Sequence, residues 1–298
     1  MTCLKTRVTG IELRHPIMNA SGVLALSEEA LEKLIESNVS AIVTKTLTLK
    51  PREGYPPPII VPIGNGLVNA VGLANPGIDA LPFIVDTVKK ETLPVIASIG
   101  GKNIDEYLAL AVKAEEAGVD AIELNLSCPN VLGYGLHSNI DTGDIVKNVK
   151  GSVKIPVWAK LGFSKDIVEE AGKALSNGAD ALVLINTLPA TVIDVYAMKP
   201  VLSNKVGGLS GPPIHPIMLY TVYTVYREYK CEIIGVGGVT DWASTIDTIL
   251  AGARAVQIAT AFYLKGYGVV NEILNGIKKY MEEQGIKHLE ELIGKAHD

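Results

Sequence analysis

The sequence predicts an α/β protein built as a single (β/α)8 barrel that spans residues 1–298. Three observations lead to this fold. A short apolar strand followed by a helix recurs eight times along the chain. Several of these helices end at a glycine that leads straight into the next strand, as at Gly118, Gly178 and Gly252. No Gly-x-Gly-x-x-Gly fingerprint opens the first helix, so a doubly wound open sheet is the less favoured alternative.

The elements begin with a short β-hairpin over residues 6–13, which turns at Thr9-Gly10. Each barrel strand expected after it is a run of four or five mostly apolar residues, the pattern of a strand inside a sheet. We expect these strands near residues 17–20, 41–44, 95–98, 121–125, 157–160, 181–185, 233–236 and 255–259.

The segments between these strands show apolar residues at the 3.6-residue spacing of a helix. Glycine readily adopts the left-handed conformation that stops a helix, which accounts for the Ala-Gly and Asn-Gly pairs at several ends. We expect the helices near residues 28–37, 79–91, 104–117, 144–150, 165–176, 213–229, 242–251 and 269–283.

Two connections are longer than a compact barrel requires. Residues 47–78 carry five prolines between Pro51 and Pro62 and then a glycine-rich turn, and residues 187–212 form the second long segment. Loops of this length are usually ligand-binding segments or lids. Because both follow strands, we expect both on the catalytic face of the barrel.

Composition narrows the class of protein. The hydrophobic fraction is 48%, yet no apolar run approaches the ~18 residues of a membrane span, so we expect a soluble protein. The first residues lack a signal-peptide pattern, and three cysteines are too few for a disulfide framework, which favours a reducing cytoplasm. A net charge of −5 argues against nucleic acid as the main partner. The five histidines show no metal-ligand spacing, so no metal is expected.

A buried strand that ends in a polar turn lies near the middle of the sequence. Pro129 lacks an N–H group and restricts the residue before it, so we expect the strand to stop at Ser127 or Cys128. Asn125 and Asn130 then crowd with them at its carboxyl end. The amides offer paired donors and acceptors and the thiol can accept a proton, which suits a planar, amide-rich ligand that loses one proton. The alternative is a buried free cysteine in an Asx-rich turn.

Two lysines and three small-residue turns fall at other strand ends. Lys45 and Lys160 lie where a barrel interior closes, and a charged amine there needs an anionic partner. Turns at Gly237-Gly238 and Ala259-Thr260 follow the last two strands, and Gly207-Gly-Leu-Ser-Gly211 precedes them. Barrels often bind phosphate in this corner through backbone N–H groups. The alternative is ordinary turn chemistry, which favours Asn, Ser and Gly.

Four motifs resemble those of the class 1 dihydroorotate dehydrogenases: Asn125-Leu-Ser-Cys-Pro-Asn130, Asn69-Ala-Val-Gly-Leu-Ala-Asn-Pro-Gly77, Asn186-Thr187 and Gly207-Gly-Leu-Ser-Gly-Pro212. The second and the fourth are closer to the B-type catalytic subunit than to the A-type. The resemblance implies an FMN-dependent barrel that oxidises dihydroorotate to orotate in pyrimidine (UMP) biosynthesis. It also implies a homodimer of this chain within a larger complex, where an electron-transfer subunit with FAD and an iron–sulfur cluster passes electrons to NAD.

The resemblance implies roles for individual residues as well. Cys128 matches the base that removes the C5 proton of dihydroorotate while hydride leaves C6 for N5 of FMN. The positions that match substrate-binding residues are Lys45, Asn69, Ala70, Val71, Gly72, Leu73, Asn125, Asn130, Asn186 and Thr187. The positions that match FMN-binding residues are Ser21, Lys45, Thr46, Ser98, Asn125, Lys160, Ile185, Gly211, Gly237, Gly238, Ala259 and Thr260.

The chain also departs from the family pattern. Ser98 stands where asparagine is usual, Ala259 replaces a common glycine, and residues 132–139 do not follow the B-type loop. Alternatives within the resemblance are an A-type enzyme that uses fumarate or another acceptor, and an FMN dehydrogenase for another pyrimidine. Outside it stand an aldolase with Lys160 or Lys45 as Schiff-base nucleophile, and a flavin-binding module without turnover.

Overall fold

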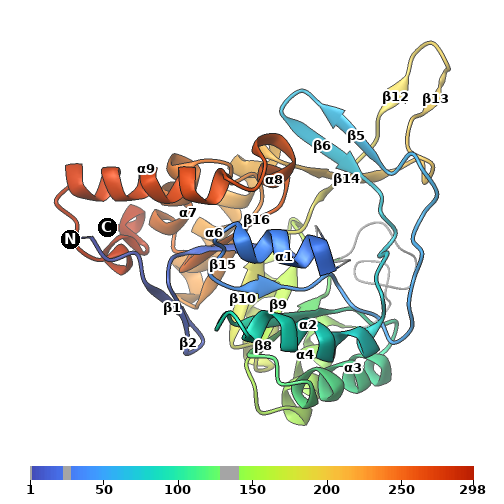
Figure 1. The fold of residues 1–298 in the computed structure, drawn as a ribbon, viewed down its shortest axis with the longest axis horizontal. Helices are drawn as coiled ribbons and strands as arrows, with labels where there is room; N and C mark the ends of the chain where they lie inside the picture. Colours follow the sequence, from blue (N-terminus) through green and yellow to red (C-terminus); the bar gives the residue numbers. More distant parts are fainter. Residues whose placement is uncertain (1, 23–27, 128–140) are drawn as a thin grey trace.

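The structure is a computed structural model that describes residues 2–22, 28–127 and 141–298. Eight parallel strands form one sheet in the order β3-β16-β15-β10-β9-β8-β7-β4, which curls into a barrel surrounded by helices (Figure 1). This arrangement confirms the predicted (β/α)8 barrel. The strands are β3 (Ile17–Asn19), β4 (Ile42–Val43), β7 (Val95–Ile99), β8 (Ala121–Asn125), β9 (Val157–Leu161), β10 (Ala181–Leu184), β15 (Ile233–Val236) and β16 (Ala255–Ile258).

The two ends of the sheet, β3 and β4, are joined by a side chain. Asn19 donates from Nδ2 to the Val43 carbonyl oxygen at 2.7 Å, and its Oδ1 accepts from the Val43 N–H at 3.0 Å. The Ser40 N–H also donates to the Ile17 carbonyl oxygen at 2.8 Å. Asn19 is fully buried, so its amide replaces the backbone ladder that would otherwise be left unpaired. Its position at a strand end thus serves closure of the barrel.

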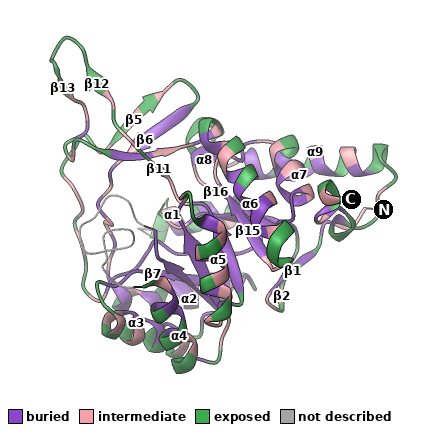
Figure 2. Ribbon diagram, turned by 180° about the vertical axis from the view of Figure 1, so that it is seen from behind, coloured by how far each residue is buried: buried purple, intermediate pink, exposed green. Residues whose placement is uncertain are grey.

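The helices lie outside the barrel, with buried faces toward the strands and exposed faces toward solvent (Figure 2). They are α1 (Glu28–Glu36), α2 (Leu81–Lys89), α3 (Ile104–Glu116), α4 (Thr142–Ser152), α5 (Ile167–Ser176), α6 (His215–Tyr229), α7 (Trp242–Leu250), α8 (Thr260–Lys265) and α9 (Val269–Glu283). The short helix α8 was not predicted, because its small first residues read as a turn. None of the described helices is long and apolar enough to cross a membrane.

The strand side chains alternate between two cores, as the period of a strand requires. One set packs against the helices, and the other fills the barrel interior around Trp158 and Met18. The predicted N-terminal hairpin, β1 (Thr6–Val8) and β2 (Ile11–Leu13), contributes Val8 and Leu13 to the interior core. Trp158 Nε1 donates to the Thr9 hydroxyl at 2.9 Å, so the hairpin closes the end of the barrel opposite the strand carboxyl ends.

The two long connections form a second sheet with each other, which was not predicted from the sequence. Its order is β11 (Leu188–Ala190), β14 (Gly207–Ser210), β6 (Gly66–Asn69) and β5 (Ile60–Ile63), all antiparallel. In the central pair, Asn69 lies opposite Gly208. A further hairpin, β12 (Ile193–Asp194) with β13 (Lys199–Pro200), projects from the body of the molecule at the upper right of Figure 1.

Candidate active site

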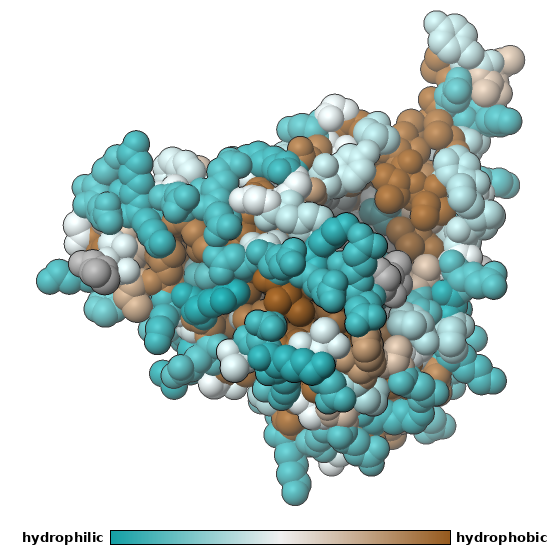
Figure 3. Space-filling view, viewed as in Figure 1, coloured by the Kyte–Doolittle hydropathy of each residue, from teal (hydrophilic) through white to brown (hydrophobic). Residues whose placement is uncertain are grey.

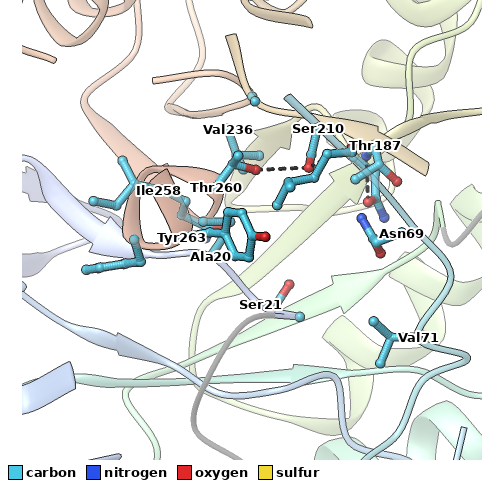
Figure 4. A pocket seen from close by; sticks show the side chains of 18 of the residues that line it. Ala20, Ser21, Asn69, Val71, Thr187, Ser210, Val236, Ile258, Thr260 and Tyr263 are labelled. Atoms are coloured by element: carbon cyan, nitrogen blue, oxygen red, sulfur yellow. Dashed lines mark hydrogen bonds between the residues drawn. The ribbon is translucent and has the colours of Figure 1, made fainter. Parts of the chain in front are cut away.

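A cavity of about 510 Å³ lies between the carboxyl ends of the barrel strands and the small sheet. This size suits a small-molecule ligand or cofactor. Figure 4 shows Thr260 joined to Ser210 by a hydrogen bond, with Thr187 beside Ser210 and Asn69 next to Thr187. The cavity therefore has a corner beside the last two barrel strands and an amide-rich region beneath the small sheet.

The corner beside the last two barrel strands is formed by backbone segments that lie too close together to leave room for side chains. Gly238 has φ +74°, a left-handed conformation that side chains disfavour. A Cβ atom on Gly238 would lie 2.7 Å from the Gly211 carbonyl oxygen. Thr260 donates from its hydroxyl to the Ser210 hydroxyl at 2.9 Å, which ties helix α8 to strand β14. The corner is thus a preformed cradle where a ligand can approach the backbone closely.

The two predicted lysines are both buried but have different partners. Lys160 Nζ donates to the Ser21 hydroxyl at 2.9 Å and lies 3.5 Å from Glu123 Oε1. Lys45 Nζ donates to the Gly22 carbonyl oxygen at 2.8 Å. Burial lowers the pKa of Lys45 to about 8, so the amine remains mainly protonated at pH 7. Both cations line the cavity and favour an anionic or electron-rich ligand.

Amide side chains gather on the opposite side. Asn186 donates from Nδ2 to Asn125 Oδ1 at 3.4 Å and to the Ser127 hydroxyl at 3.1 Å. Its Oδ1 accepts from the Thr187 N–H at 2.8 Å, which fixes the orientation of the amide. Asn69 donates to the Gly208 carbonyl oxygen at 3.2 Å across the β6–β14 pair. These groups can pair with the N–H and C=O groups of a planar ring.

Most of the sequence-predicted residues meet at this cavity. Those that line it are Ser21, Lys45, Thr46, Asn69, Val71, Gly72, Leu73, Asn125, Lys160, Ile185, Asn186, Thr187, Gly211, Gly237, Gly238, Ala259 and Thr260. Ala70 is buried in the small core beneath the second sheet, and Ser98 is buried in the barrel below the cavity floor. The predicted base Cys128 and the predicted ligand Asn130 lie outside the described residues.

Two polar residues of the barrel interior were missed by sequence reasoning. Glu123 is completely buried, and Gln257 lines the cavity floor beside Lys160. Alternation along the strand could have revealed the first, because Glu123 is two residues from Asn125 and shares its face. None of the described histidine, cysteine, aspartate and glutamate side chains form a cluster that could hold a metal ion.

Comparison with known proteins identifies the family of this chain. The family described as "Dihydroorotate dehydrogenase" matches residues 3–281. A relative from Thermoplasma volcanium, named "Dihydroorotate dehydrogenase B (NAD(+)), catalytic subunit", is 45% identical over 99% of this chain and 99% of its own length. A protein of the same name from Pyrococcus furiosus is 44% identical over 98% of each chain. The "Putative dihydroorotate dehydrogenase A (fumarate)" of Aeropyrum pernix is 44% identical over 99% of this chain and 97% of its own. The chain belongs to the dihydroorotate dehydrogenase family.

Proposed function

We propose that the protein oxidises dihydroorotate to orotate in pyrimidine biosynthesis, with FMN as its cofactor. The observation that carries the proposal is the cavity, where a glycine cradle, two buried lysines and a set of amides converge. Family membership agrees with the same activity. The amide set suits a pyrimidine ring, and the protonated Lys45 suits its carboxylate.

The residues present fit FMN. The Gly238 corner has the close backbone approach that a phosphate site requires, since a Cβ there would collide with Gly211. The buried Lys160 amine suits the electron-rich edge of a flavin ring. FMN would supply the acceptor for the hydride that leaves C6 of the substrate. The residues that would hold it are Ser21, Lys45, Thr46, Asn125, Lys160, Ile185, Gly211, Gly237, Gly238, Ala259 and Thr260.

The protein's own groups would bind and deprotonate the substrate. Asn69, Asn125 and Asn186 orient the ring through donors and acceptors whose directions are set by their protein partners. Cys128 is the proposed base at C5, on the ground of the family motif. A cysteine thiol has an ordinary pKa of about 8.5 and serves once the site favours the thiolate.

We propose that electrons leave through a second subunit with FAD and an iron–sulfur cluster, which reduces NAD. Seven relatives are named as NAD(+)-type catalytic subunits, and these names support the presence of a second subunit. We also propose a homodimer of this chain within that complex. Apolar side chains gather over the small sheet and the base of the projecting hairpin (Figure 3), and Tyr196 and Met198 on the hairpin are 94% and 86% exposed. Surfaces of this kind usually mark protein contacts.

A second candidate is an A-type enzyme that passes electrons to fumarate. The observation that favours it is the 44% identity to the Aeropyrum pernix protein, whose printed name specifies fumarate. Both candidates share the first half-reaction and differ only in the acceptor.

The absorbance spectrum of the purified protein tests the shared half-reaction. A flavin spectrum that bleaches when dihydroorotate is added without oxygen supports the proposal. Matched additions of dihydrouracil, which lacks the carboxylate, should bleach it far more slowly because Lys45 has no anion to bind. A colourless protein, or a flavin that dihydroorotate leaves oxidised, would contradict the proposal.

A further inference from the structure

A polar layer lies inside the barrel directly beneath the cavity. Glu123 of β8 and Gln257 of β16 are hydrogen-bonded at 2.7 Å, although three strands separate β8 from β16 in the sheet. Their contact therefore crosses the barrel interior. Gln257 and Lys160 line the cavity. Glu123 has no exposed surface and does not line it. A buried acidic side chain that a ligand does not touch needs another explanation.

Glu123 accepts hydrogen bonds from every side. Its Oε1 accepts from the Ser21 hydroxyl at 2.6 Å and from the Ser98 hydroxyl at 3.1 Å, and Lys160 Nζ lies 3.5 Å away. Its Oε2 accepts from Gln257 Nε2 at 2.7 Å. All four neighbours present donors, so the side chain acts only as an acceptor, which is the role of a carboxylate.

One arm of this network leads to the proposed cofactor side. Because Ser21 donates to Glu123, its oxygen is free to accept from Lys160 Nζ at 2.9 Å. Because Gln257 turns its amide nitrogen to Glu123, its Oε1 faces Lys160 Nζ at 3.4 Å. The carboxylate thus sets the direction of both contacts that hold the Lys160 amine beneath the cavity.

The other arm leads to the proposed substrate side. Since Ser98 donates to Glu123, it accepts from Thr46 in the 3.0 Å contact between their hydroxyls. Thr46 in turn accepts from Asn125 Nδ2 at 3.0 Å. The side-chain oxygen Oδ1 of Asn125 is thereby turned toward Asn186. A chain of hydrogen bonds with one direction therefore runs from Asn125 to Glu123.

We infer that Glu123 is a positioning residue, the common acceptor that fixes how Lys160 and Asn125 are presented to their ligands. The inference rests on the proposed function for the identity of those ligands, FMN and a pyrimidine. An amide at position 123 has the same shape, but one of its two oxygens is replaced by an NH2 group, which is a donor. That donor must face either the serine hydroxyls or Gln257, and each choice reverses one arm of the network.

The decisive variants are Glu123→Gln alone and Glu123→Gln combined with Gln257→Glu. In the double variant, the new amide nitrogen donates to the new carboxylate, whose other oxygen accepts from Lys160. The new amide oxygen accepts from Ser21 and Ser98, so both arms keep their wild-type directions and only the bond between residues 123 and 257 is reversed. The control is Glu116→Gln, which makes the same charge change at an exposed site on α3. Calorimetry gives the Kd of FMN for the apoprotein and the Kd of orotate for the FMN-loaded protein, and thermal melting reports folding.

We expect Glu123→Gln to raise both Kd values by about tenfold or more, as the loss of charge-assisted hydrogen bonds implies. The double variant should return both to within about threefold of wild type, and the control should match wild type. A Glu123→Gln protein with unchanged Kd values would overturn the inference, as would a double variant no better than the single one. If the single variant does not fold, a folded double variant with both Kd values within about threefold of wild type supports the inference, and one with weaker binding contradicts it. Wild-type protein that bound neither ligand would overturn the proposed function as well, which separates the two failures.

Discussion

At the scale of single residues, Lys45 and Lys160 carry the same amine but have different partners in the cavity. Lys160 lies 3.5 Å from a carboxylate oxygen, whereas burial lowers the pKa of Lys45 to about 8. Because the pKa of Lys45 lies close to physiological pH, anion binding by this amine should depend on pH in that range.

The affinity for orotate should therefore fall as pH rises above the pKa of Lys45. We expect the Kd of orotate to be nearly constant from pH 6 to 7. At pH values above the pKa of Lys45, the Kd should rise by up to about tenfold per pH unit. Lys45→Arg keeps its charge throughout this range and should remove the dependence. Calorimetric titrations from pH 6 to 9 measure both proteins. The same pH dependence in both would show that Lys45 is not the group that titrates.

Cys128 carries the proposed proton transfer, and the motif places it between Ser127 and Pro129. Cys128→Ala should still bind orotate but should reduce the flavin slowly, because a general base contributes about 10²-fold or more. Stopped-flow measurement of flavin bleaching by dihydroorotate at neutral pH gives the rate. Ser127→Ala is the matched control and should have the smaller effect. A Cys128→Ala rate within about threefold of wild type would assign the base elsewhere.

At the scale of elements, the turn after β15 shows how backbone conformation can define a ligand site. Gly238→Ala adds a single methyl group that would lie 2.7 Å from the Gly211 carbonyl oxygen at φ +74°. We expect at least about a tenfold loss of FMN affinity. Gly151→Ala makes the same change in helix α4, where nothing lies within 4 Å of the added atom, and should leave flavin content unchanged. Equal flavin content in the two variants would argue against this corner as the phosphate site.

Elements that are encoded by a pattern within their own segment of the chain could be predicted from the sequence. Barrel strands and outer helices appear as apolar runs and 3.6-residue periods, and residues at strand ends converge because the strands are parallel. That logic brought Lys45, Lys160 and Asn125 to one cavity. The second sheet escaped prediction because Asn69 pairs with Gly208, 139 residues away, and because proline-rich sequence suggests a loop. Glu123 escaped because its role depends on partners from four other segments.

At the scale of the whole molecule, the barrel and the second sheet together enclose the cavity, and the β12–β13 hairpin extends beyond them. The interior of the barrel is apolar near the N-terminal hairpin and polar under the cavity, so its binding groups are supported from below. The β12–β13 hairpin extends away from this body with apolar side chains exposed, among them Val195 at 74%. This division suits a subunit that oxidises its substrate in one place and contacts other proteins in another.

The route of the electrons can be tested with the isolated chain. The sequence holds three cysteines, fewer than the four thiolates of common iron–sulfur clusters, and its first helix has no dinucleotide fingerprint. The purified chain with FMN should therefore reduce an artificial dye with electrons from dihydroorotate but should not reduce NAD. Steady-state assays with dye, NAD and fumarate as acceptors compare these outcomes on one preparation. Rapid NAD reduction by the single chain would contradict the proposed partner subunit. Fast fumarate reduction would instead favour the A-type alternative, because fumarate would then accept the electrons directly at this chain and no second subunit would be needed.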